Sequence, residues 1–164
     1  MTFSKNSLAA LLVFAFALPG FAQKVEMKVK LSPAGSFTIT GTSLSGKVIR
    51  KGSSIIVQNV VLDLRSLQSG MELRDKHVQE YFETSKFPQA VLLKAVGKDA
   101  KFVGDLKIRG IVKRIEGSFE DEGKTAKASF KVNMSDFKIK KANYMGLGVN
   151  DEITVEVEGP VSGP

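Results

Sequence analysis

The sequence lacks several residue types on which common protein functions depend. Among its 164 residues there are no cysteines, no tryptophans, one histidine and two tyrosines. Without cysteine the chain has no disulfide, thiol nucleophile, cysteine-ligated zinc or covalently attached c-type haem. With one histidine it has no bis-histidine haem and no zinc site built from two or more histidines. These absences exclude most familiar routes to catalysis and favour binding as the function.

What is present is typical of one globular domain. Hydrophobic residues make up 43% of the chain and charged residues 25%, which is ordinary for a folded protein, and the length suits a single domain. There are 24 Lys and Arg against 17 Asp and Glu, a net charge of +7. The sequence carries no motif that reads a nucleic-acid groove, so nucleic acid is not an expected partner.

The first 22 residues have the layout of a secretory signal peptide. Lys5 supplies a positive charge, residues 8–18 are all apolar, and the small residues Gly20 and Ala22 precede a cleavage site before Gln23. The apolar run is shorter than the roughly 20 residues that span a bilayer. The sequence therefore predicts an exported protein whose single domain comprises residues 23–164.

Most of the remaining chain alternates between apolar and polar residues. This period of two, clearest in residues 24–31 and 125–135, is typical of strands with one buried face. Further strands are predicted over residues 36–41, 44–51, 55–64, 89–96, 102–109, 113–120 and 153–157. Short turns join most of them, which favours antiparallel pairing. Because a small all-β domain has no helical layer to protect its edges, we expect the eight to nine strands to close into a barrel.

One segment departs from the strand pattern. In residues 71–83, Leu73, His77 and Tyr81 are spaced four apart, as are Val78 and Phe82, which is the spacing of one helix face. The sequence predicts a short helix here, inserted among the strands and placed to cover one end of the barrel.

The helical segment also carries a specific motif. In order, its residues are Leu67 and Gly70, then Arg74, Asp75 and His77, then Tyr81 and Phe82, and finally Lys86, Phe87 and Pro88. This order resembles the signature of the YceI-like family. Residues 104–112 resemble a glycine-bounded hairpin of that family, and residues 128–137, 144–146 and 149–155 resemble its C-terminal portion. The chain departs from the family in residues 31–44, which lack the histidine and tryptophan that many members carry there.

The resemblance implies an all-β fold, an antiparallel eight-stranded lipocalin-like barrel with a short helical insertion. It implies a periplasmic protein whose apolar cavity binds an isoprenoid chain, either a quinone or a polyprenyl phosphate. It also implies that the protein is not an enzyme. No catalytic, cofactor-binding or metal-binding residues are expected, and the bound isoprenoid lipid or quinone is the only small molecule implied.

The candidate ligand-binding residues lie on inward-facing strand positions and in the motif. They are Phe37, Ile39, Leu73, His77, Tyr81, Phe82, Phe102, Leu106, Phe119, Phe130, Met134, Phe137 and Tyr144. Arg74 and Asp75 are adjacent, so on a helix they face different partners, and structural contacts at the barrel rim are their simpler interpretation. The sequence has no G-x-S-x-G motif that would place a hydrolase nucleophile near His77.

Basic residues cluster in the loop that precedes Tyr144. Lys138, Lys140 and Lys141 suit an anionic partner, such as a phosphate head group or an anionic membrane surface, or they form an ordinary solvated loop. Two functions stay open at this point. The first is a carrier, store or stress-protective binder of isoprenoid lipid, and the second is a packed barrel that acts as an envelope stress or interaction module without a physiological ligand. A monomer and a homodimer are both compatible with the sequence.

Overall fold

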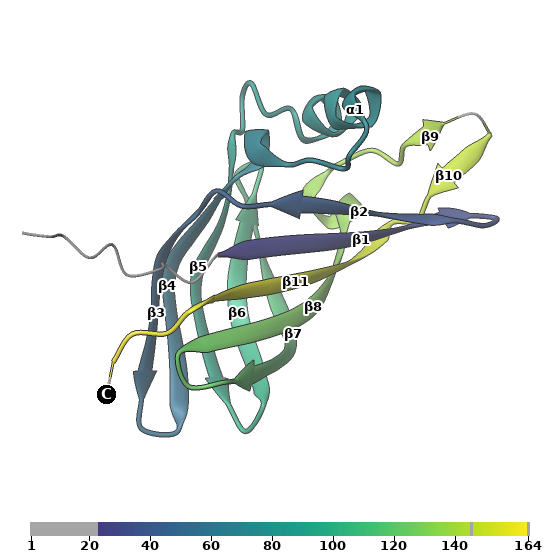
Figure 1. The fold of residues 1–164 in the computed structure, drawn as a ribbon. Coiled ribbons are helices and arrows are strands. Elements are labelled where there is room, and N and C mark those ends of the chain that lie inside the picture. The colour runs from purple at the N-terminus through teal and green to yellow at the C-terminus, as the bar shows by residue number, and fades with distance from the viewer. Residues whose placement is uncertain (1–22, 145, 164) are drawn as a thin grey trace, which may run out of the picture.

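The computed structural model of this protein describes residues 23–163 except residue 145. The predicted signal peptide, residues 1–22, lies outside the described residues. In the described part, eleven strands form a single curled sheet, and the one α-helix, α1, lies across one end of it (Figure 1). Two short 3-10 helices are the remaining elements. The all-β fold predicted from the sequence is confirmed.

The elements follow the predicted segments closely. In chain order they are β1 (Lys24–Ser32), β2 (Ser36–Gly41), β3 (Leu44–Lys51), β4 (Ser54–Asp63), η1 (Leu64–Ser66), α1 (Glu72–Phe82), β5 (Gln89–Lys98), β6 (Lys101–Ile108), β7 (Ile111–Asp121), β8 (Thr125–Asn133), η2 (Met134–Phe137), β9 (Asn143–Tyr144), β10 (Leu147–Val149) and β11 (Glu152–Pro160). The helix predicted over residues 71–83 is α1. Two strands were not predicted, because β9 and β10 are only two and three residues long and show no period of two. The short 3-10 helices η1 and η2 were not predicted either.

All ladders of the sheet are antiparallel, and their order is β3-β4-β5-β6-β7-β8-β11-β1-β10-β9, with β2 also paired to β1. Sequential hairpins account for the run from β3 to β8. The C-terminal strand β11 then joins this run to β1 by pairing with both β8 and β1. The N- and C-terminal strands are therefore neighbours in the middle of the sheet.

The barrel is not closed by a continuous ladder, in contrast to the closure expected from the sequence. Among the described residues no ladder joins β2 to β3. At one end of this gap, Thr40 exchanges backbone hydrogen bonds with Gln68 at 2.8 and 2.9 Å, so the segment after η1 takes the partner position beside β2. At the other end, Ser162 bonds Val48 and Arg50 of β3. Short contacts of loop and tail thus replace a ladder across this gap.

The inner face of the sheet forms the core. Val25, Met27 and Val29 of β1 are buried, whereas Lys24 before them and Lys28 between them lie at the surface. The rings of Phe102 and Phe130 pack edge to face with centroids 5.8 Å apart, a favoured aromatic geometry. On β1 the apolar face is therefore buried and the lysine face exposed, as the alternation predicted.

Candidate functional site

The curled sheet encloses an inner cavity of about 180 Å³. Its lining is almost entirely apolar and comes from strands on all sides of the sheet. Four of the predicted ligand-binding residues line only this cavity: Phe102, Leu106, Phe119 and Phe130. Strand β8 contributes two small side chains to this lining, Ala126 and Ala128.

A second cavity of about 570 Å³ lies at the end of the sheet covered by α1, and we call it the mouth cavity. Its lining comes from α1, from β1 and β2, and from residues 139–143, 147 and 149–151, together with Met71, Met134 and Ile153. Figure 1 shows α1, β1, β2, β9 and β10 at this end of the sheet. Five predicted residues line only this cavity: Phe37, Ile39, Leu73, His77 and Tyr81. The predicted residues Phe82 and Met134 line both cavities.

Two predicted residues are placed elsewhere. The side chain of Phe137 is 1% exposed and lines neither cavity. It belongs to η2, whose turn directs the ring into the packed core beneath the rim. The backbone of Tyr144 forms β9, and its side chain lies outside the described part of the structure.

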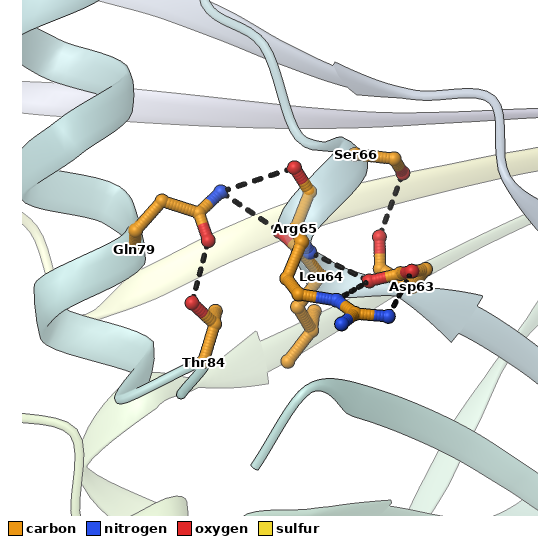
Figure 2. Close-up of polar contacts among 6 residues, drawn as sticks. All are labelled: Asp63, Leu64, Arg65, Ser66, Gln79 and Thr84. Carbon is orange, nitrogen blue, oxygen red and sulfur yellow. Dashed lines mark hydrogen bonds and ion pairs between the residues drawn. The ribbon is translucent and has the colours of Figure 1, made fainter. Parts of the chain in front are cut away.

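Helix α1 is attached to the rim of the sheet through Gln79. Figure 2 shows the Gln79 amide nitrogen donating to the carbonyls of Leu64 and Arg65, at 3.1 and 3.4 Å, while its oxygen accepts from the hydroxyl of the buried Thr84 at 2.6 Å. The carbonyls belong to η1, at the end of β4. One amide side chain thus joins the helix, the residues after it and the rim.

The 3-10 turn that receives Gln79 is held by Asp63. Its carboxylate accepts hydrogen bonds from the backbone and the guanidinium of Arg65 (Figure 2). The Arg65 side chain and then its backbone N–H lower the pKa of the Asp63 carboxyl. The hydroxyl of Ser66 donates to the Asp63 carbonyl at 2.6 Å. These local contacts fix the carbonyls that face α1.

A second attachment comes from Arg109, in the two-residue turn between β6 and β7. Its guanidinium donates to the Glu83 carboxylate at 2.6 Å, to the Phe137 carbonyl at 3.3 Å and to the Lys138 carbonyl. Its charge centre also lies 5.7 Å from the ring centre of Phe87. The hydrogen bond from Arg109 is the main cause that lowers the pKa of the Glu83 carboxyl. Arg109 therefore joins the end of α1 to the start of the basic loop.

The polar residues of the motif reach separate partners, as their adjacency on the helix predicted. The Asp75 carboxylate accepts from the backbone and hydroxyl of Ser69, at 2.6 and 2.5 Å, and so fixes the chain that enters α1. The Arg74 guanidinium lies 4.2 Å from the ring centre of Phe37, on the wall of the mouth cavity. Asp75 is thus structural, whereas Arg74 and His77 face the mouth cavity.

Cationic side chains slightly outnumber acidic ones around the mouth cavity. Arg74, Lys140 and Lys141 line it, together with the acidic residues Glu80 and Asp151. The Asp151 carboxylate already accepts hydrogen bonds from the backbone and hydroxyl of Ser135. The arrangement offers an apolar chamber with cations at its rim, which suits an amphiphile with an anionic end.

Sequence reasoning missed several residues of the mouth cavity. Val29 and Ile153 lie in predicted strands, but nothing in the sequence placed them beside α1. Leu147 and Val149 come from the unpredicted strand β10. These residues meet only because β1 pairs with both β10 and β11, a long-range pairing that the pattern of residues does not reveal.

The described residues show neither a metal site nor a membrane-spanning helix. No group of three or more His, Asp or Glu side chains in residues 23–144 and 146–163 is arranged to hold a metal ion. In the same residues no helix has the length and apolarity needed to cross a bilayer.

Comparison with solved structures identifies the fold. Burkholderia cenocepacia BcnA is similar with a TM-score of 0.64 and 17% identity over 83% of this chain and 94% of that chain. A polyisoprenoid binding domain from Saccharophagus degradans, implicated in plant cell wall breakdown, has a TM-score of 0.58 and 14% identity over 86% of this chain and 94% of that chain. A mutant CJ YceI protein has a TM-score of 0.54 and 19% identity over 76% of this chain and 85% of that chain.

Two sequence comparisons were made. The search of curated proteins found no match to the chain, whereas the comparison with protein-family models agrees with the fold. The family model of the YceI-like domain matches residues 13–160, which is most of its length. Together with the curled antiparallel sheet and its apolar interior, this match shows that the chain belongs to the YceI-like family.

Proposed function

We propose that this protein binds an isoprenoid lipid, with the chain in the two cavities and the polar end at the mouth. The observation that carries the proposal is the pair of largely apolar cavities inside the curled sheet, which share Phe82 and Met134 in their linings. Membership of the YceI-like family supports it, as does the similarity of fold to a polyisoprenoid binding domain. We propose binding without catalysis, and no resident cofactor.

The energetics suit such a ligand. Each CH₂-sized group that leaves water contributes about 0.8 kcal/mol. A chain of about 20 carbons therefore supplies on the order of 10 kcal/mol before the cost of ordering it, enough for micromolar or tighter binding. Specific polar contacts are needed only at the head group.

The head group distinguishes the two ligand classes expected from the sequence. A quinone is neutral, whereas a prenyl phosphate carries negative charge. Arg74, Lys140 and Lys141 at the mouth complement a phosphate, and the planar guanidinium of Arg74 suits two phosphate oxygens at once. The charge at the mouth therefore favours a prenyl phosphate over a quinone.

We also propose that the protein is exported and acts in the periplasm. The signal-peptide pattern of residues 1–22 supports export. A water-filled compartment offers an isoprenoid lipid no soluble phase, so a binding protein there serves carriage, storage or protection during stress. Lys138, Lys140 and Lys141 then approach the anionic membrane surface from which the lipid is taken. Co-sedimentation with anionic liposomes tests this contact: we expect the protein to bind the liposomes at low salt and to be released at high salt.

Lipid content and titration test the proposal directly. Native mass spectrometry and organic extraction of the gently purified protein reveal any lipid bound in the cell. Titrations with a prenyl phosphate, a prenyl alcohol and a prenyl quinone of equal chain length then compare head groups. We expect micromolar or tighter binding with the phosphate tightest. An empty protein that binds none of the three contradicts the proposal and favours an envelope stress or interaction module without a ligand.

A further inference from the structure

The outer face of strands β3 to β6 carries a row of apolar side chains, which we call the apolar row. It comprises four cross-strand partners in the β3–β4, β4–β5 and β5–β6 ladders: Ile49, Ile56, Val96 and Val103. Their neighbours along the strands, such as Val48, Val57 and Phe102, line the inner cavity, so the apolar row points outward. None of its four residues lines either cavity. The proposed lipid site therefore does not account for them.

Two residues of the apolar row are among the most exposed large hydrophobic residues that the structure describes. Val96 is 51% exposed and Val103 is 37% exposed. On the outer face of β1 and β11 the cross-strand partners are instead charged or polar, since Glu26 lies opposite Glu156 and Lys28 opposite Thr154. A contiguous group of exposed apolar side chains on an otherwise polar surface is typical of an interaction site.

Cationic side chains flank the apolar row on both sides. One flank contains Lys51, Lys98 and Lys101, and the other contains Lys47, Lys94 and Asp105. Lys94 lies 3.4 Å from Asp105, whereas the other four lysines form no ion pair with a described residue. Where the row ends at β7, Arg114 and Glu116 add one charge of each sign. The excess of positive charge disfavours contact between two apolar rows, because like charges would meet.

A groove with the opposite charge lies over the other half of the sheet. It has a volume of about 410 Å³, is lined by residues of β7, β8, β11 and β1, and we call it the outer groove. Three half-buried apolar residues that are cross-strand neighbours line it: Phe119, Ala128 and Val157. Its charged lining residues are four glutamates and two lysines: Glu26, Glu120, Glu156, Glu158, Lys24 and Lys127.

The pKa of Lys127 reports the negative potential in the outer groove. The carboxylate of Glu122 is the main cause that raises this pKa, and the charges of Glu158 and Glu120 raise it further. Among the described residues, neither Glu120 nor Glu158 lies in a salt bridge. The outer groove therefore combines apolar surface with acidic groups that can accept further cations.

We propose that the apolar row of one copy of this chain docks in the outer groove of a second copy. The apolar side chains of the two surfaces then meet, and the lysines beside the row face the glutamates of the groove. The two surfaces differ and belong to different halves of the sheet (Figure 1), so the copies associate head to tail. Such association extends into chains unless it closes into a ring. Neither surface includes a residue of the mouth cavity, so the proposal is independent of lipid binding.

Sedimentation velocity of the purified protein tests this association. For the wild type we expect the sedimentation coefficient to rise with protein concentration at low salt. The rise should be smaller at high salt, because the lysines and glutamates at the rims of the contact are screened.

Two variants each disable one surface. Lys98→Glu combined with Lys101→Glu reverses the charge beside the apolar row, and Ser129→Trp fills the outer groove, which Ser129 lines. Each variant should self-associate at least about tenfold more weakly than the wild type. Lys76→Glu combined with Lys86→Glu is the matched control, because it changes the net charge equally at exposed positions outside both surfaces, and it should associate like the wild type.

Mixing the two variants gives the sharpest result. The row variant keeps an intact outer groove, and the groove variant keeps an intact apolar row. An equal mixture should therefore form dimers but nothing larger, although each variant alone is monomeric. Circular dichroism confirms that each variant is folded. If Ser129→Trp does not fold, Glu120→Gln combined with Glu158→Gln replaces it as the groove variant.

Three results overturn the proposal. The first is a wild type that stays monomeric at every concentration, whether or not its apolar row binds anionic vesicles instead. The second is association that neither variant weakens, which would place the contact elsewhere. The third is a mixture of the two variants that forms no dimer. None of these results bears on isoprenoid binding, which is measured separately.

Discussion

Replacing Arg109 tests how the mouth of the cavity is held together. Arg109→Met keeps a long apolar stem but removes two hydrogen bonds from a charged donor, to the carbonyls of Phe137 and Lys138. Each such bond contributes about 1.5–3 kcal/mol. The buried Arg109 Nε has no hydrogen-bond partner, and removing it returns about 1–3 kcal/mol. The net expected loss of unfolding free energy is about 2 kcal/mol.

The ion pair between Arg109 and Glu83 is not counted in this loss of unfolding free energy, because the Glu83 side chain is 40% exposed and water screens the pair. For a domain of this size, a loss of about 2 kcal/mol lowers the Tm by roughly 4–8 °C. Thermal and urea unfolding followed by circular dichroism measure it. Arg109→Lys keeps the charge but not the planar fork, so it restores only part of the loss.

The same variant has a functional readout. Arg109 joins the residue after α1 to the start of the basic loop. Hydrogen exchange of backbone amides in residues 72–84 and 138–141 should therefore become faster in Arg109→Met, while exchange in β8 remains close to that of the wild type. A Tm within 1 °C of the wild type together with unchanged exchange at the mouth would refute the assigned role of Arg109.

Two further predictions concern charged groups. Lys140→Gln combined with Lys141→Gln should weaken binding of a prenyl phosphate about tenfold at low salt and leave binding of the matching prenyl alcohol unchanged. Lys107→Gln serves as the control. An equal loss of affinity for both ligands would contradict a phosphate site. The hydrogen bond from Arg50 is the main cause that lowers the pKa of Asp121 below its ordinary value of 3.8. This stabilisation is complete above about pH 3.8 and is lost as the pH falls through the lowered pKa of the folded state. The Tm advantage of the wild type over Asp121→Asn should therefore shrink in acid, and an advantage that stays constant from pH 7 to pH 2 would contradict the pairing.

The strands could be predicted from the sequence because their signal is local. Each strand needs only alternating side chains and a turn at its end, as in β1 and β8. The ends of the pattern were less exact. Met134 and Ser135 continue the alternation of β8, yet they begin η2, where the Met134 amide donates to the Asp151 carbonyl and the Ser135 amide to the Asp151 side chain. Those bonds come from a residue far away in the chain.

The candidate site was predictable in its composition and not in its arrangement. The sequence indicated which aromatic and aliphatic residues face inward, and most of them line one of the two cavities. It gave no means of dividing them between the cavities, since Phe82 and Met134 are far apart in the chain. It also gave no sign that Phe137 packs in the core and lines neither cavity, because in the sequence Phe137 looks like the other phenylalanines that were predicted to bind the ligand.

The amino-acid sequence by itself determined the strands, the helical insertion and the resemblance to the YceI-like family, because alternation, spacing and a short motif are properties of neighbouring residues. Its lack of cysteine and its single histidine favoured binding as the expected function before any contact was known. The tertiary structure alone decided that the barrel stays open between β2 and β3, that Arg109 and Gln79 hold α1 to the rim, and that two cavities meet at Phe82 and Met134. These features depend on pairings between distant segments, whose geometry no local pattern specifies.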